Sequence, residues 1–252
     1  MSKILTFNNV NFSYFNKSGE TKAVGNLNFS VESGEFLGIV GPSGCGKTTI
    51  LSLIAGLITP SSGEILLEGE KITKPSNKIG YMLQKDELFE WRKVLSNVLI
   101  GAEINKTKDK NSEEKARRIL NKYGLKNFEN TYPSELSGGM RQRVALIRTL
   151  LLNPSILLLD EPFSALDFQT RLSVCNDVSN IIKTENKTAI FVTHDISEAI
   201  SMCDRIIVLT TRPTTVKKIF TIDFDVSLTP LMRRNEPKFS EYFNLIWQEI
   251  QN

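Results

Sequence analysis

The residues best suited to chemistry form one glycine-rich stretch, Gly41-Pro42-Ser43-Gly44-Cys45-Gly46-Lys47-Thr48, followed by Thr49. Its spacing matches the pattern of a loop that wraps a phosphate chain. Glycines let several backbone N–H groups turn toward one anion, and a helix that begins at such a loop adds the positive end of its dipole. Lys47 supplies a full positive charge, and the Thr48 hydroxyl can bind Mg²⁺. We therefore predict that this stretch binds the phosphates of a nucleoside triphosphate.

The segments on either side have the patterns needed to hold this loop between a strand and a helix. Phe36-Leu37-Gly38-Ile39-Val40 is a short apolar run of the kind that forms a buried parallel strand. Thr49 to Ala55 places apolar residues at helical spacing. Because the motif binds phosphate in this strand–loop–helix setting, a chance glycine-rich turn is the weaker interpretation.

Two adjacent carboxylates follow a second buried strand. Ile156-Leu157-Leu158-Leu159 is the apolar run, and Asp160-Glu161 comes at its end. Asp160 can hold Mg²⁺, directly or through water, and Glu161 can orient and polarise an attacking water. A solvated acidic turn is the alternative, but a phosphate loop already predicts a metal-holding Asp after an apolar strand.

A second glycine-rich turn, Ser137-Gly138-Gly139, precedes a helix. After it, Met140, Val144, Ile147 and Leu151 recur at helical spacing. The start of a helix after two glycines is able to bind an anion, so a second phosphate-binding turn is plausible.

Three polar or aromatic residues stand at strand ends. Gln84 follows the expected strand Ile79–Leu83, and His194, the single histidine, follows the apolar run Ala189–Thr193. The carboxyl ends of strands in an α/β sheet are where ligands bind, yet a lone histidine is as often structural as functional. Tyr14 ends the first strand, where an aromatic ring suits either a sheet edge or stacking on a nucleotide base.

Composition narrows the classes of protein. The chain has 252 residues and a net charge of +3, which is too weak to indicate nucleic-acid binding. Cys45, Cys175 and Cys203 are widely spaced, as expected of free thiols in a reducing compartment. Cys45 fits either an oxidation-sensitive thiol or simply a small residue in the loop. No apolar run approaches the length of a membrane span, and the N-terminus turns polar too soon for a signal peptide, so we expect a cytoplasmic protein.

The remaining patterns indicate a β layer, a charged helical region and a packed tail. Leu27, Phe29 and Val31 alternate on one face of an expected strand over 26–31. The stretch from Lys106 to Lys122 is highly charged with a thin apolar stripe, which is typical of a solvated helix. From Lys238 onward, aromatic and aliphatic residues recur on one helical face, and we expect that helix to pack on the body.

The phosphate loop, Gln84, the Ser137–Gly139 turn, Asp160-Glu161 and His194 occur in an order and spacing that resemble the ATP-binding-cassette (ABC) ATPases. Leu136 and the segment Ser164-Ala165-Leu166-Asp167 belong to the same pattern. The resemblance runs to about Arg212. It implies an α/β fold: a P-loop NTPase (RecA-like) core with a mainly parallel sheet, an N-terminal antiparallel β layer and an inserted α-helical subdomain.

The resemblance also implies a single ABC ATPase domain over 1–252 and a role for each matched residue. Residues 1–85 and 154–215 would form the nucleotide-binding core with the β layer, 86–153 the helical subdomain, and 216–252 a C-terminal strand and helix. ATP and Mg²⁺ would be bound. For nucleotide binding, the resemblance implies that Tyr14 stacks on adenine and that Gly41–Thr49 binds the phosphates. It implies that Mg²⁺ is bound by Thr48, Gln84 and Asp160. For catalysis, it implies that Glu161 is the general base and that His194 contacts the γ-phosphate, and it counts Lys47 and Gln84 as catalytic too.

Ser137, Gly138 and Gly139 would act, by this resemblance, on the ATP of a second copy of the chain. One triphosphate needs one glycine-rich turn and this chain has two, so a head-to-tail pair would use both. The segment ending at Asp167 would line the seam between the copies.

The stretch Leu88–Val98, which contains Trp91, resembles the importers of nitrate, sulfonates and taurine, and the Thr211-Arg212-Pro213 turn fits them too. This resemblance implies an ATPase subunit at the cytoplasmic face of the cell membrane, paired with permease subunits and served indirectly by a solute-binding protein. Three alternatives remain: a subunit of an exporter or lipid-extraction complex, a soluble ABC ATPase acting on ribosomes or DNA, and a small-molecule kinase. No nucleic-acid partner is expected.

Overall fold

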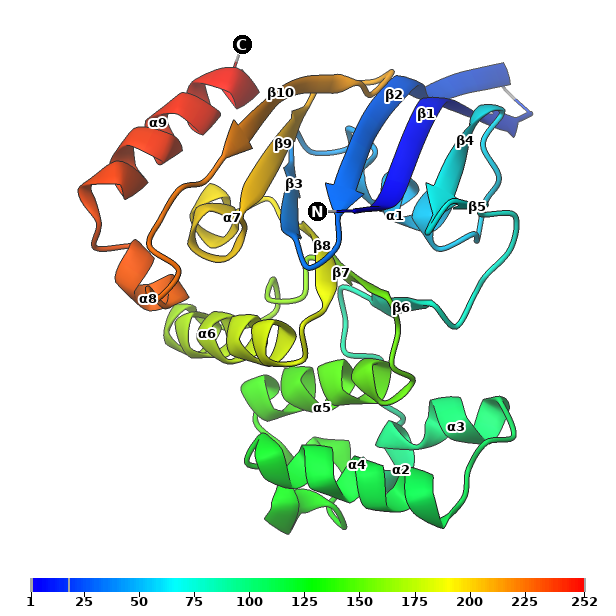
Figure 1. Ribbon diagram of the computed structural model, residues 1–252, viewed down its shortest axis with the longest axis vertical. Helices are drawn as coiled ribbons and strands as arrows, with labels where there is room; N and C mark the ends of the chain where they lie inside the picture. The colour runs from blue at the N-terminus through cyan, green and yellow to red at the C-terminus, as the bar shows by residue number, and fades with distance from the viewer. Residues whose placement is uncertain (1, 18, 252) are drawn as a thin grey trace.

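A six-stranded sheet forms the centre of the molecule in the computed structural model, which describes residues 2–17 and 19–251 (Figure 1). Its strand order is β10-β9-β3-β8-β7-β6, and all neighbours are parallel except the antiparallel edge pair β10–β9. The strands are β3 (Phe36–Val40), β6 (Ile79–Met82), β7 (Ile156–Asp160), β8 (Thr188–Val192), β9 (Arg205–Leu209) and β10 (Val216–Thr221).

The apolar runs become the middle of this sheet because both of its faces are covered. Every residue of β3, β7 and β8 is buried, as parallel strands require. Side chains alternate between two cores: Leu37 and Ile39 pack with the β layer and α1 (Lys47–Ile54), whereas Phe36 and Val40 pack with the helices of the other face. The predicted α/β class with a mainly parallel sheet is confirmed.

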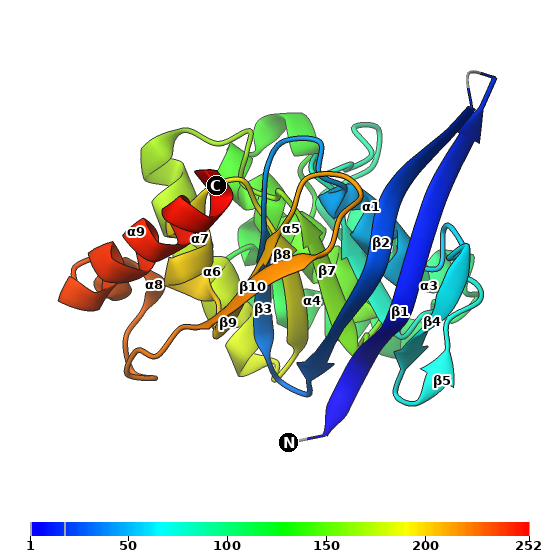
Figure 2. The same ribbon diagram turned by 90° about the horizontal axis from the view of Figure 1, so that it is seen from above.

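A second, antiparallel sheet covers the α1 face, as the sequence predicted. Its order is β2-β1-β4-β5, from β1 (Lys3–Asn16), β2 (Gly19–Glu32), β4 (Ser62–Leu67) and β5 (Glu70–Lys71). The prediction of a strand over 26–31 was too short. Residues 19–25 also pair with β1, and this ribbon projects beyond the body (Figure 2). Residues 19–22 are exposed, so the outer part of β2 has no buried face and shows no apolar alternation.

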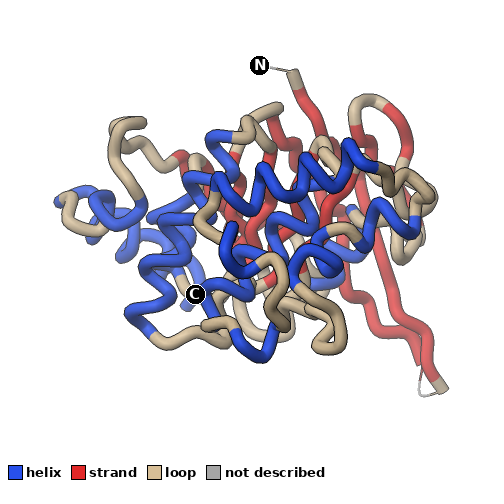
Figure 3. Tube along the Cα trace, turned by 90° about the horizontal axis from the view of Figure 1, so that it is seen from below, coloured by secondary structure: helices blue, strands red, loops and turns tan. Residues whose placement is uncertain are grey.

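Helices fill the chain between β6 and β7 (Figure 1), and in the view of Figure 3 helices lie in front of the strands. They are α2 (Val94–Val98), α3 (Ile100–Ile104), α4 (Lys110–Lys122) and α5 (Gly138–Leu151). The charged region predicted from Lys106 becomes helical only at Lys110, because the Asp109 side chain caps the backbone N–H of Ser112. Its apolar stripe, Ala116, Ile119 and Leu120, is buried. The short α2 and α3 were not predicted.

The other face of the central sheet carries α6 (Phe168–Thr184), α7 (Ile196–Met202), α8 (Pro230–Arg233) and α9 (Pro237–Gln251). The predicted tail helix is α9, and its packing on the body is confirmed: Ile246 is fully buried, and Phe239, Tyr242, Phe243 and Ile250 pack around the same core. The C-terminal strand expected within 216–252 is β10, which ends at Thr221, and α8 was not predicted. Within the described residues no helix combines the length and hydropathy needed to span a bilayer.

Candidate active site

A cavity of about 460 Å³ opens where the chain leaves four neighbouring strands of the central sheet. The loop after β3, Glu161 after β7, His194 after β8 and Arg212 after β9 all reach it. Ligands of open α/β sheets bind at this carboxyl edge. The lining residues are Ser43, Gly44, Gly46, Lys47, Thr48, Thr49, Glu161, His194 and Arg212.

The glycine-rich loop folds as an anion-binding turn that leads into α1. Gly44 and Gly46 have positive φ of 71° and 116°, which glycine adopts without the penalty of a side chain. Lys47 reaches back across the loop, and its Nζ donates to the carbonyl oxygens of Gly41 (3.0 Å) and Pro42 (3.2 Å). The loop therefore combines a fixed ammonium group with the exposed start of a helix.

Oxygen ligands suited to Mg²⁺ meet beside the loop. The Thr48 hydroxyl lies 3.5 Å from Oδ1 of Asp160, and the Tyr81 hydroxyl donates to Oδ2 at 3.4 Å. Burial raises the pKa of Asp160, and the nearby Glu161 raises it further, whereas the Thr48 hydrogen bond opposes them. A hydroxyl and a carboxylate fit a hard cation. The described residues contain no cluster of three or more His, Cys, Asp or Glu that could hold a metal, so further ligands would come from phosphate, from water or from a residue of another kind such as Gln84.

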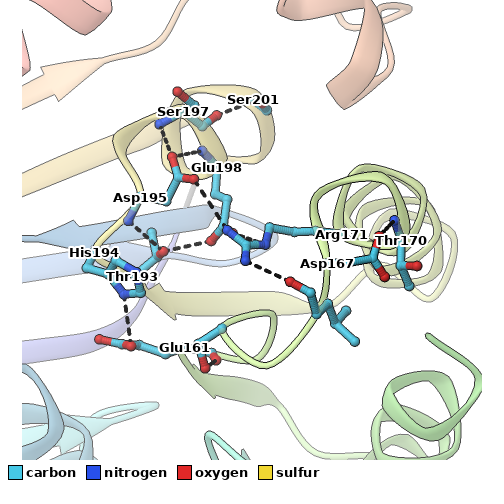
Figure 4. Close-up of polar contacts among 12 residues, drawn as sticks. Glu161, Asp167, Thr170, Arg171, Thr193, His194, Asp195, Ser197, Glu198 and Ser201 are labelled. Atoms are coloured by element: carbon cyan, nitrogen blue, oxygen red, sulfur yellow. Dashed lines mark hydrogen bonds and ion pairs between the residues drawn. The ribbon is translucent and has the colours of Figure 1, made fainter. Parts of the chain in front are cut away.

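The neighbouring carboxylates, Asp160 and Glu161, face different partners. Glu161 has a φ of 44°, in the left-handed region that a non-glycine residue seldom occupies, and its N–H donates to the carbonyl of Val192 at 2.8 Å. This turn brings Glu161 Oε2 to 2.9 Å from Nδ1 of His194 (Figure 4), while Asp160 stays with Thr48. Such local strain is common at functional sites.

A network that the sequence analysis missed supports His194 (Figure 4). Arg171 on α6 donates to the carbonyl of Leu166 at 2.8 Å and forms ion pairs with Asp195 (3.9 Å) and Glu198 (3.8 Å). Glu198 is buried, which raises its pKa, and it accepts a hydrogen bond from Thr193 at 2.7 Å. Arg171 thus joins the segment after Glu161 to the segment that carries His194. No signal in the sequence singled it out.

Some predicted site residues lie outside the cavity. The hydroxyl of Tyr14 is 3.1 Å from Thr49 Oγ1, so Tyr14 stands beside the loop. Gln84 is exposed, and its amide donates to Ser164 at 3.4 Å. Ser137 caps the start of α5 and is exposed; neither it nor Gly138 or Gly139 lines the cavity. The roles assigned to these residues therefore stay predictions.

With this geometry in view, the chain can be compared with known proteins. Residues 24–164 match the family model described as ABC transporter. The chain belongs to the ABC transporter family. The chain is an ABC ATPase.

The ABC ATPase resembles characterised and uncharacterised relatives over most of its length. It is 49% identical to the uncharacterized ABC transporter ATP-binding protein YtlC of Bacillus subtilis (strain 168), covering 98% of this chain and 96% of that protein. It is 42% identical to the aliphatic sulfonates import ATP-binding protein SsuB of Bacillus anthracis, covering 85% and 84%. It is 39% identical to the nitrate import ATP-binding protein NrtD of Synechocystis sp. (strain ATCC 27184 / PCC 6803 / Kazusa), covering 94% and 91%.

A solved structure gives the same fold. The dimeric, post-hydrolysis structure of the ATP-binding cassette MJ0796 with ADP and Pi has a TM-score of 0.73 and 30% identity to this ABC ATPase, covering 88% of this chain and all of that one.

The three cysteines of the ABC ATPase are free and buried. Burial raises the pKa of each thiol, although the charges of Lys47 and Arg212 partly oppose the shift at Cys45. The small-residue interpretation of Cys45 is therefore favoured over a reactive thiol, because only the thiolate is nucleophilic.

We expect no more than slow alkylation of the native protein by iodoacetamide at pH 8, because thiols with raised pKa carry little thiolate and these three have almost no solvent access. Mass spectrometry would count the adducts. After unfolding in guanidinium chloride, all three cysteines should be fully alkylated in the time during which the native protein reacts only slightly. Rapid labelling of native Cys45 would contradict the assignment.

Proposed function

We propose that this ABC ATPase is the ATP-hydrolysing subunit of an importer that takes up a small solute of the sulfonate, nitrate or taurine class. The observation that carries this proposal is its identity to ATP-binding proteins named for such import, which extends over most of both chains. In this proposal the subunit works at the cytoplasmic face of the membrane with permease subunits, and a solute-binding protein delivers the solute.

A rigid, exposed loop supports contact with a membrane partner. Trp91 is 74% exposed, and its ring packs in a tilted arrangement against Phe89, with ring centroids 5.1 Å apart. Asn97 is fully buried beneath this loop, and its side chain donates to the carbonyls of Phe89 and Arg92 and accepts from the N–H of Phe89. A large exposed aromatic on a fixed backbone suits a protein interface.

Hydrolysis in this proposal depends on groups at the carboxyl edge of the sheet. The loop N–H groups and Lys47 bind the phosphates, and Glu161 accepts a proton from the attacking water. His194, 2.9 Å from Glu161, orients that carboxylate and reaches the γ-phosphate. Tyr14 stacks on adenine, and Gln84 would hold Mg²⁺ together with Thr48 and Asp160. A bound Mg²⁺ would neutralise part of the phosphate charge.

Two copies are needed because the second glycine-rich turn lies away from the chain's own cavity. In a head-to-tail pair, Ser137, Gly138 and Gly139 of one copy close the nucleotide site of the other, and each site then uses both turns. The dimeric state of the MJ0796 cassette supports this arrangement.

Replacing Glu161 with Gln should lower the turnover of ATP by about 10²- to 10⁴-fold, because a neutral amide cannot accept the proton. ATP binding should persist, and gel filtration with Mg²⁺ and ATP should show a stable dimer. Glu114→Gln, on the exposed face of α4, is the matched control and should keep wild-type turnover. Undiminished turnover in Glu161→Gln would refute the assigned base.

Mixing two inactive variants tests the shared site. Lys47→Ala and Ser137→Arg should each be inactive alone, because each damages both sites of a symmetric pair. A mixed pair has one site with both changes and one intact site, so an equal mixture should recover up to about a quarter of wild-type turnover. Steady-state phosphate release measures this. If the mixture stays inactive while native gels show that mixed pairs have formed, the sites are not shared.

Uptake assays test the import proposal. Cells lacking the chain should lose uptake of a radiolabelled aliphatic sulfonate, taurine or nitrate, and wild-type but not Glu161→Gln protein should restore it, since import needs turnover. Unchanged uptake of all three solutes with slowed efflux of another would favour the exporter alternative. Salt-sensitive binding of the purified chain to RNA or DNA would favour the nucleic-acid alternative.

A further inference from the structure

Arg212 lines the nucleotide cavity, yet no step proposed above uses it. It lies in the turn between β9 and β10, and it shares the cavity with Ser43, Gly44 and Lys47 of the phosphate loop. From the sequence, this turn was marked only by its resemblance to one group of importers. Its position raises the question of which ligand the guanidinium meets.

The turn is fastened to the phosphate loop directly beside Arg212. Thr214 is fully buried, and its hydroxyl donates to the carbonyl of Cys45 inside the loop. A Cβ on Gly46 would lie only 3.1 Å from the Thr214 hydroxyl, so the two segments are in close contact. The backbone around Arg212 therefore has a fixed position relative to the phosphate-binding N–H groups.

The same turn is also tied to the β layer. The N–H of Thr214 donates to the carbonyl of Ala23, and the N–H of Gly25 donates to the carbonyl of Thr214, both at 2.9 Å. Pro213 packs on Gly25, where a Cβ would come within 3.3 Å of its ring. Because β2 and the loop hold the turn from two sides, the backbone that presents Arg212 is fixed, and binding costs mainly the rotamer freedom of its side chain.

The guanidinium of Arg212 has no partner of its own. Across residues 2–17 and 19–251, no salt bridge and no side-chain hydrogen bond of Arg212 is present, and the residue is exposed toward the cavity. By contrast, Lys47 already donates to two carbonyls. The positive charge of Arg212 also acts on the interior of the phosphate loop. It lowers the pKa of the Cys45 thiol and so partly offsets the rise that burial causes.

We propose that Arg212 binds the phosphate chain of the nucleotide held in this cavity, as a second cation beside Lys47. A planar guanidinium with several N–H donors matches phosphate oxygens and forms charge-assisted hydrogen bonds with them. The inference rests on the proposed nucleotide site and adds a contact from outside the phosphate loop. The β9–β10 turn thereby becomes part of the binding site.

Equilibrium binding tests this assignment, with a non-hydrolysable ATP analogue, ADP and adenosine as probes in titration calorimetry or in competition with a fluorescent nucleotide. In Arg212→Ala we expect the Kd of the ATP analogue to rise by about 10-fold or more, as for loss of a charge-assisted hydrogen bond. The Kd of ADP should rise by the same factor or less, and that of adenosine should not change. Arg212→Lys should recover part of the loss.

Thr211→Ala, one position earlier on the same exposed turn, is the matched control and should bind like wild type. Equal thermal unfolding midpoints for all variants would exclude a folding defect. An unchanged Kd in Arg212→Ala, an equal loss for adenosine, or an equal loss in Thr211→Ala would overturn the assignment.

Lys47→Ala separates this inference from the site on which it rests. If Lys47→Ala weakens binding of the ATP analogue and Arg212→Ala does not, the Arg212 contact is refuted and the nucleotide site stands. If neither variant weakens binding, the nucleotide is bound elsewhere and both proposals fail.

Discussion

The dense negative charge of a triphosphate is the constraint on which this structure depends. It must be neutralised at a site that is held rigidly and partly shielded from water. In the proposed site this charge is met at one edge of the central sheet, where β3, β7, β8 and β9 end together. Each strand is anchored in an apolar core, so the polar groups that follow it are held in place by packing far from the ligand.

The adjacent carboxylates contact different partners because the backbone turns sharply between them. Asp160 remains in line with β7 and stays buried beside Thr48, whereas the left-handed turn at Glu161 sends its side chain to His194. The network around Arg171 then joins that histidine to the segment ending at Asp167. If this segment lines a seam between two copies, as proposed, pairing and hydrolysis are linked through one guanidinium.

Two parts of the molecule lie outside the core that carries the cavity but bear on its use. The helical region of α2–α5 presents Ser137 and Trp91 on its surface, away from the chain's own cavity. The β9–β10 turn does the opposite. Arg212 is far from the phosphate loop in sequence, and the turn places it beside that loop at the cavity. A site that draws on so many segments is assembled only when the whole chain has folded.

The sequence by itself determined the phosphate loop, the buried strands and the acidic pair, because these depend on local backbone freedom and on continuous apolar runs. The first residues of β2, 19–22, escaped it, because they are exposed and leave no apolar pattern. Arg171 and Tyr81 are ordinary polar residues in their own segments, and Arg212 was marked only by the resemblance of its turn to one group of importers. Only the tertiary structure decided their contacts, because their partners lie on other strands and helices that folding brings within hydrogen-bonding reach.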